Sequence, residues 1–342
     1  MKPREIMIKA FEGGKTDRVP VSLFGAGMWA INNSGNTFQG LSGDARKMTD
    51  MLVGMSDKLL CDIVYAGSGY NNFHISCMGG GIKYREIGAP DLLEHVVQSE
   101  EDLARLDIGK IDQEPVIKIV KEALKATQDK IGDEYLLTMT AWGPFTLAAR
   151  LVGEETMMKA TFKKPEFVKK VVEFATEVLI HLYEPLIKDG TMKLISLADP
   201  TASGDLISKK QFVVFAAPYL KKFTDWAKSH GAYTLVHICG DTTDRLDSFL
   251  ETGASCISLD HKVNIARAKE VLGGKMCFAG NVDPVKIMLQ GTVDDVEKEC
   301  RRIIEVAGRD GGFVLMPGCD IPPTVPYENI QKFVEVARGW KL

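Results

Sequence analysis

A histidine and a cysteine two positions apart, His237 and Cys239, are residue types that together suit metal chemistry. They lie in the apolar run 234–241, which is expected to form a buried strand that stops at Gly240. On an extended chain, side chains two positions apart point to the same side. A neutral imidazole beside a thiolate is half of a zinc site, although both residue types also occur in buried strands as packing residues.

The other half of the site is expected at Cys319, which follows Pro317 and Gly318 at the end of another apolar run. Irregular backbone after a strand can turn such a side chain towards the mouth of a barrel. A His-Cys-Cys set leaves one tetrahedral zinc position open, which is the arrangement of a catalytic rather than a structural site. Small zinc modules draw their ligands from tight loops, so only the fold can join residues this far apart in the sequence.

Two aspartates at the ends of other predicted strands are the expected catalytic partners. Asp260 is the candidate for the fourth zinc position, with His261 as a competing ligand. Alternatively, Asp260 caps the helix that follows or is a salt-bridged loop residue. Asp199 is expected to orient the substrate or to hydrogen-bond a zinc ligand.

Two further residues at strand ends are expected to bind the substrate. Trp142 is predicted to be a wall of the cavity rather than a participant in the chemistry. Asn281 is predicted to contact the substrate, while it and Asp283 are alternatively caps of the next helix. His74 lies in a glycine-rich stretch and is expected at the surface.

Eight apolar runs alternate with helical patterns, which is typical of parallel β/α units. The predicted strands are residues 17–25, 60–67, 135–144, 194–200, 234–241, 256–260, 276–283 and 313–316. The predicted helices are residues 3–12, 43–58, 100–129, 145–151, 154–160, 165–189, 208–230, 241–252, 264–272, 292–308 and 326–339. We therefore expect an α/β fold, a (β/α)₈ TIM barrel with an N-terminal extension, as a single domain over residues 1–342. An open doubly wound sheet is the alternative; the barrel is favoured because polar residues follow so many strands, and the carboxyl ends of barrel strands form the active-site face.

Residues 68–98 break the alternation of strands and helices. They are rich in glycine and asparagine, and long loops of this kind in a compact domain are usually functional or mobile. We expect an excursion after the second strand that carries a small hairpin around residues 82–87 and lies over one end of the fold.

The composition limits the partners of the protein. The net charge of −4 and the pI of about 5.9 favour neither nucleic acid nor an anionic membrane, which would both select a basic face. No run is apolar enough to span a membrane, and the charged N-terminal pattern does not resemble a signal peptide. The seven cysteines are odd in number and irregular in spacing, so most are expected to be reduced, in the cytoplasm.

Several motifs resemble the uroporphyrinogen decarboxylase superfamily over nearly the whole chain. They are Asp-Arg-Val-Pro-Val at 17–21, Gly-Pro-Phe-Thr-Leu-Ala at 143–148, Asp-Pro-Thr-Ala-Ser at 199–203, His-Ile-Cys-Gly-Asp-Thr at 237–242 and Gly-Asn-Val-Asp-Pro at 280–284. The His-x-Cys pattern with a distant cysteine resembles the zinc-dependent corrinoid methyltransferase branch. That branch includes methylcobalamin:coenzyme M methyltransferases and the methyltransferases that start O-demethylation of aryl methyl ethers. The family fold is a (β/α)₈ barrel.

The resemblance implies methyl transfer between a corrinoid (cobalamin) and a small substrate, with Zn²⁺ as a Lewis acid. The substrate is either a methylated donor such as a methyl ether or an acceptor thiol. The Asp-x-His-x-x-Gly signature of cobalamin binding is absent from the sequence, so the corrinoid is expected on a separate corrinoid protein. The glycine-rich excursion at 67–81 is expected to move to admit it.

Two other functions compete with methyl transfer. A true uroporphyrinogen decarboxylase, in porphyrin biosynthesis, holds a substrate with many carboxylates on an arginine-rich segment that reads Met-Arg-Gln-Ala-Gly-Arg. The corresponding stretch here, residues 24–30, contains no arginine, and Asp62 alone does not bind a polyanion. The second competitor is a binding module with a structural zinc, which would require four protein ligands.

Overall fold

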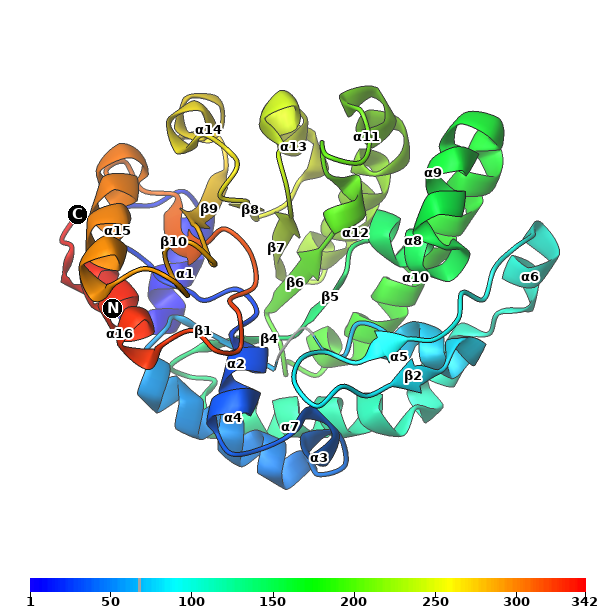
Figure 1. Ribbon diagram of the computed structural model, residues 1–342, viewed down its shortest axis with the longest axis horizontal. Helices are drawn as coiled ribbons and strands as arrows, with labels where there is room; N and C mark the ends of the chain where they lie inside the picture. The colour runs from blue at the N-terminus through cyan, green and yellow to red at the C-terminus, as the bar shows by residue number, and fades with distance from the viewer. Residues whose placement is uncertain (67–68) are drawn as a thin grey trace.

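The computed structural model describes residues 1–66 and 69–342, which form a ring of parallel strands surrounded by helices (Figure 1). Six strands pair in the order β10-β9-β8-β7-β6-β5, and β1 pairs with β4. The barrel strands are β1 (Ile63–Tyr65), β4 (Leu136–Thr138), β5 (Thr140–Trp142), β6 (Leu194–Ala198), β7 (Tyr233–Ile238), β8 (Cys256–Leu259), β9 (Cys277–Val282) and β10 (Phe313–Pro317). Only Met139 separates β4 from β5, so together they replace the single strand predicted over 135–144. The predicted (β/α)₈ barrel is confirmed.

The N-terminal run 17–25 closes the ring, but it is not the regular strand that the sequence predicts. Val21 forms an isolated parallel bridge with Leu315 of β10. On its other side, the Asp62 N–H donates to the Val21 carbonyl at 2.8 Å. The prediction of a regular strand is therefore wrong, while its place between β1 and β10 is correct. Pro20 has no N–H to donate, which prevents a continuous ladder through this run.

The predicted helices occur in the predicted order with different boundaries. The helices of the structure are α1 (Pro3–Phe11), α2 (Ala26–Asn33), α3 (Phe38–Ser42), α4 (Ala45–Leu59), α5 (Phe73–Ile75), α6 (Glu100–Arg105), α7 (Pro115–Ile131), α8 (Pro144–Val152), α9 (Glu154–Lys163), α10 (Pro165–Lys188), α11 (Lys209–Phe215), α12 (Ala217–Ser229), α13 (Leu246–Phe249), α14 (Ile265–Leu272), α15 (Val293–Ala307) and α16 (Tyr327–Gly339). Of these, α2, α3 and α5 lie where the sequence predicts no helix. The helix predicted over 100–129 is split into α6, a 3₁₀ turn and α7, because Pro115 starts a new helix. Similarly, Pro218 lies in the first turn of α12 and separates it from α11. The described residues contain no helix long and apolar enough to cross a membrane.

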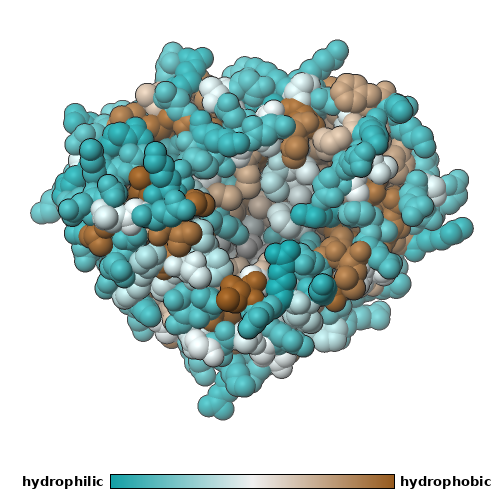
Figure 2. Space-filling view, viewed as in Figure 1, coloured by the Kyte–Doolittle hydropathy of each residue, from teal (hydrophilic) through white to brown (hydrophobic). Residues whose placement is uncertain are grey.

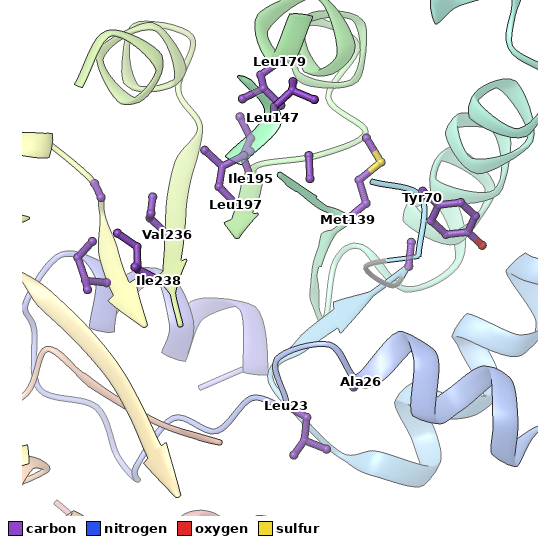
Figure 3. Packing of buried hydrophobic residues seen from close by; sticks show 14 of the residues in the cluster. Leu23, Ala26, Tyr70, Met139, Leu147, Leu179, Ile195, Leu197, Val236 and Ile238 are labelled. Carbon is purple, nitrogen blue, oxygen red and sulfur yellow. The ribbon is translucent and has the colours of Figure 1, made fainter. Parts of the chain in front are cut away.

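Alternation along the strands produces two hydrophobic cores. Outward-facing residues such as Ile195, Leu197, Val236 and Ile238 pack with the surrounding helices (Figure 3). Inward-facing residues fill the barrel: Leu194, Ala198, Leu235, Cys256, Cys277, Ala279, Val314 and Met316. Met7, Ala10 and Phe11 of α1 join this inner core, so the N-terminal helix closes the end of the barrel opposite the strand carboxyl ends. The same alternation directs the odd-numbered residues of β7 into the barrel.

The excursion after β1 contains α5, a π-helical turn (Ser76–Gly80) and a hairpin of β2 (Ile82–Lys83) with β3 (Asp91–Leu92). The predicted hairpin is thus confirmed, whereas Gly67 and Ser68 lie outside the described residues. The N–H groups of Val96 and Val97 both donate to the Leu151 carbonyl of α8 at 2.9 Å. These bonds hold the excursion beside α8.

The prediction of a surface histidine at position 74 is wrong. His74 is only 2% exposed, because the excursion folds into a compact layer of its own instead of lying open. Burial, together with the positive charge of Lys121, lowers the pKa of His74 to about 4.

Candidate active site

The structure brings together the three predicted metal ligands. His237 lies on the inner face of β7, Cys239 follows the end of the same strand, and Cys319 follows β10. The Cys239 Sγ is 3.2 Å from the His237 Nε2 and 3.5 Å from the Cys319 Sγ. The ligand atoms of all three residues lie within 4.8 Å of one another. Strand alternation and the neighbouring ends of parallel strands therefore produce the cluster that the sequence spacing suggests.

The side chain of His237 is oriented by a residue that the sequence analysis did not identify. The Ser258 Oγ is 3.0 Å from the His237 Nδ1, and strand register places these residues opposite each other on β7 and β8. This contact directs Nε2 towards the cysteines and selects the nitrogen available to a metal. Phe24 packs against the imidazole, with ring centroids 4.6 Å apart. Ser258 could have been found as the inward-facing residue two positions before Asp260.

The three residues of the cluster shift one another's pKa values. The hydrogen bond with Cys239 and the charge of His237 lower the pKa of Cys319 to about 4, despite its burial. The same hydrogen bond, with burial, raises the pKa of Cys239. Burial opposes the imidazolium form of His237, but the thiolate of Cys319 outweighs it and raises the pKa of His237. The cluster thus stabilises a thiolate, the form of cysteine that binds metals.

These three residues fit a zinc ion. Bonds of about 2.3 Å to sulfur and 2.0–2.1 Å to nitrogen, arranged tetrahedrally, require ligand atoms about 3.3–3.8 Å apart. The two distances from the Cys239 Sγ, 3.2 and 3.5 Å, are close to that requirement. Within the described ranges, no additional histidine, cysteine or carboxylate belongs to the cluster. A tetrahedral ion held by these three residues would therefore keep one coordination position open.

Asp260 and Asn281, two other predicted site residues, brace the backbone around the cluster. The Asp260 carboxylate accepts hydrogen bonds from the Gly240 N–H at 2.8 Å and from the Lys262 N–H at 3.0 Å. It also pairs with His261 at 2.9 Å. The Asn281 Nδ2 donates to the carbonyls of Asp260 and Val263. In this arrangement both side chains hold the turns that follow β7 and β8, so they support the ligands through the backbone.

Asp199 is fully buried at the end of β6. Its Oδ1 accepts a hydrogen bond from the Thr146 N–H in the first turn of α8 at 2.6 Å. Its Oδ2 has no hydrogen-bond partner in the part of the chain that the structure describes. Burial raises the pKa of Asp199 to about 6. The carboxylate faces Gly143, where an added Cβ would be 2.7 Å from the Asp199 Oδ2, and Asp199 is not among the described residues that line the cavity. Pro200, the next residue, lines the cavity beside the cluster.

A cavity of about 230 Å³ opens over the cluster at the carboxyl ends of the strands. Its walls include Phe24, Trp142, Pro200, Asn71, Asn72 and Asp320. Trp142 lies where the sequence analysis expects it, and its Nε1 donates to the Asn72 Oδ1 of the excursion at 2.9 Å. The space-filling view is hollowed at its centre, with pale and brown side chains on the floor and hydrophilic ones around it (Figure 2).

The loop that presents Cys319 depends on a close backbone contact at Gly318. The Gly318 N–H donates to the Val282 carbonyl at 2.8 Å. A Cβ at this position would lie 2.3 Å from the His261 backbone nitrogen. Only glycine therefore allows the chain after β10 to approach the turn after β8, which carries Cys319 to the other two ligands.

Asp62 lies away from this cavity. Its carboxylate accepts two hydrogen bonds from the Arg18 guanidinium, at 2.6 and 2.9 Å, and one from the Val21 N–H at 2.8 Å. It precedes β1, so it is at the amino end of the barrel, whereas the cluster is at the carboxyl end. Asp62 is thus a structural residue, and among the described residues no arginine lines the cavity.

A (β/α)₈ barrel whose mouth contains a His-Cys-Cys cluster that could hold a metal ion has the form of an enzyme. The chain belongs to the uroporphyrinogen decarboxylase (URO-D) family, which it matches over residues 2–340. It is 30% identical to the methylcobamide:CoM methyltransferase MtbA of Methanosarcina acetivorans, over 99% of this chain and 98% of that protein. A solved structure of a methyltransferase from Methanosarcina mazei superposes with a TM-score of 0.88 at 26% identity, covering 98% of both chains. The uroporphyrinogen decarboxylase of Geotalea daltonii is 27% identical over 71% of each chain. The full-length similarities are to methyltransferases, and this chain is an enzyme of that class.

Proposed function

We propose that this enzyme transfers a methyl group between a corrinoid and a small substrate, and that it holds a zinc ion on His237, Cys239 and Cys319. The observation that supports the proposal is the open His-Cys-Cys cluster on the floor of a cavity at the barrel mouth. Its relatives include proteins named for methyl transfer from methylcobamide to coenzyme M. When bound, zinc would lower the pKa of a thiol or polarise an ether oxygen, and the corrinoid would carry the methyl group.

The residues of the chain have separable roles in this proposal. Ser258 and Phe24 fix the imidazole of His237, so that its Nε2 faces the ligand position. Trp142 and Pro200 limit the space beside that position, which restricts how the substrate can lie. Methyl transfer is an in-line displacement, so holding the two reactants in line supplies much of the rate. Asp199 has a positioning role in this proposal, because its Oδ1 accepts from the Thr146 N–H and so holds the start of α8, the segment that follows Trp142.

The corrinoid reaches the cavity on a separate corrinoid protein in this proposal. A cavity of about 230 Å³ is too small for a corrinoid, so the corrinoid stays outside and presents its reactive face at the mouth. The excursion contributes Asn71 and Asn72 to the cavity wall, so its movement would widen the entrance. All seven cysteines are free thiols, which is compatible with the proposed cytoplasmic location.

Zinc content and methyl transfer test the proposal together. Wild-type protein is expected to contain one zinc per chain by elemental analysis and to demethylate methylcobalamin with a thiol. Cys319→Ser is expected to lose zinc and this activity, because a hydroxyl is a much weaker zinc ligand than a thiolate. The matched control is Cys77→Ser, which alters another partly exposed free cysteine outside the cluster. Metal-free wild type, or equal zinc in both variants, would refute the proposal.

A further inference from the structure

Two members of the cluster are cysteines whose sulfur atoms lie close together and are open to the cavity. The Cys239 Sγ is 3.5 Å from the Cys319 Sγ. Both residues are partly exposed, and both line the cavity of about 230 Å³ at the barrel mouth. Hydrogen peroxide is far smaller than this volume, so a dissolved oxidant of this size reaches the pair.

Another pair of neighbouring cysteines is sealed from solvent. Strand register places Cys256 opposite Cys277 on β8 and β9, and both side chains belong to the inner core of the barrel. Their exposed fractions are 0% and 1%, so an oxidant in solution does not meet them. Access as well as closeness therefore distinguishes the two cysteines of the cluster, and access is what makes a thiol susceptible to oxidation.

A small movement joins the two sulfur atoms of the cluster. A disulfide bond is about 2.05 Å long, so atoms that are 3.5 Å apart must approach by about 1.5 Å. Each cysteine lies in the turn just after a strand, Cys239 after β7 and Cys319 after β10. Rotation about the Cα–Cβ bonds supplies the approach while the backbone stays in place. The spacing that fits zinc therefore also suits a disulfide bond when the metal is absent.

We propose that hydrogen peroxide converts Cys239 and Cys319 of the metal-free site into a reversible disulfide bond, which switches off the candidate metal centre. One sulfur attacks the peroxide: an S–O bond forms, the O–O bond breaks, and the hydroxide that leaves takes the proton of that thiol. The second sulfur attacks the resulting sulfenic acid: the S–S bond forms, the S–O bond breaks, and the second hydroxide takes the remaining thiol proton. Two thiols and one peroxide give one disulfide and two water molecules.

The disulfide bond and a zinc ion exclude each other at this site. Zinc binds cysteine as the thiolate, whereas the sulfur atoms of a disulfide carry no charge. Oxidation would leave His237 as the remaining member of the three-residue cluster. Formation of the disulfide goes beyond the proposed function and does not depend on it, while its effect on metal binding rests on that function. Exchange with a dithiol reverses the reaction and restores the site.

Peptide mapping of metal-free wild type tests the proposal. The protein is treated with an equimolar amount of hydrogen peroxide, free thiols are alkylated, and an unreduced tryptic digest is analysed by mass spectrometry. Cleavage after lysine and arginine places Cys239 in peptide 229–245 and Cys319 in peptide 310–332, each with no other cysteine. The expected product is these two peptides joined by a disulfide bond, with two of the seven thiols lost. Dithiothreitol is expected to restore both thiols.

The same treatment of zinc-loaded protein measures the consequence for the metal. A chromogenic chelator is expected to record the release of one zinc per chain as the joined peptides form. Cys77→Ser is the matched control, because Cys77 is partly exposed but lies outside the cluster, and it is expected to give the wild-type product. Cys319→Ser is expected to give none.

Two results separate this inference from the proposed function. Intact thiols, sulfinic acid, or a disulfide to Cys77 in place of the joined peptides would overturn the inference, while zinc found by elemental analysis would leave the proposed function standing. Protein that forms the disulfide but binds no zinc would overturn the proposed function and support the inference.

Discussion

At the scale of single residues, the chemistry of the site depends on how His237 is held. The imidazole has two nitrogens, and its contact with the Ser258 Oγ at 3.0 Å leaves Nε2 for the cluster. Partners of this kind fix the tautomer and the ring orientation of a metal-binding histidine. Strand register sets this pair, because His237 and Ser258 are opposite each other on β7 and β8.

The substitution Ser258→Ala is expected to lower zinc affinity by about 10- to 100-fold, the usual cost of losing such a partner. The reason is that the imidazole is then free to rotate and to present either nitrogen. Competition with a chromogenic zinc chelator measures the affinity, and Ser229→Ala, at the exposed end of α12, serves as the control. Unchanged zinc affinity in the Ser258 variant would show that Phe24 alone orients the ring.

At the scale of elements, the site is made by the turns that follow the strands. Asp260 accepts hydrogen bonds from the N–H groups of Gly240 and Lys262, so it joins the turn after β7 to the turn after β8. Gly318 brings the chain after β10 against the same turn, at His261. The three ligands therefore stay in place because their turns are bonded or packed to one another.

The substitution Gly318→Ala tests this packing between turns. The added Cβ would meet the backbone nitrogen of His261 at 2.3 Å, and backbone atoms cannot move aside as a flexible side chain does. We expect Cys319 to be displaced, zinc affinity to fall at least tenfold, and the protein to lose about 1–3 kcal/mol of stability.

Urea denaturation and zinc competition measure the two effects of Gly318→Ala. Gly339→Ala, at the end of α16, is the matched control, because no atom of the described residues lies within 4 Å of the place its new Cβ would take. A Gly318 variant with native stability and native zinc affinity would contradict the role given to the close contact.

At the scale of the whole molecule, the candidate site and a group of stabilising contacts lie at opposite ends of the barrel. The carboxyl end holds the cluster and the cavity, whereas α1 closes the amino end with Met7, Ala10 and Phe11. Asp62 and Arg18 lie at the amino end and join run 17–25 to β1. This ion pair therefore stabilises the closure of the ring and takes no part in the chemistry.

The substitution Arg18→Met is expected to destabilise the protein by about 3–5 kcal/mol, because it leaves the buried carboxylate of Asp62 without a counterion. Zinc affinity is expected to stay unchanged, since the cluster is at the opposite end. Urea denaturation gives the stability, and Lys159→Met, which removes an exposed ion pair with Glu155, is expected to cost less than about 1 kcal/mol. A loss of zinc affinity in folded Arg18→Met would contradict this separation of roles.

The sequence by itself determined the barrel and the three residues of the candidate metal cluster. Period-two strands alternating with helices permit few architectures, and His237, Cys239 and Cys319 each lie at or just after the end of a strand, so that one edge must bring them together. The tertiary structure alone decided the details that depend on distant segments. It buried His74, assigned Asp260 and Asn281 to holding the turns, supplied Ser258, and placed Asp320 beside the ligands. Local propensity reflects which conformations a segment favours, whereas register, burial and field depend on neighbours that the chain reaches only when it is folded.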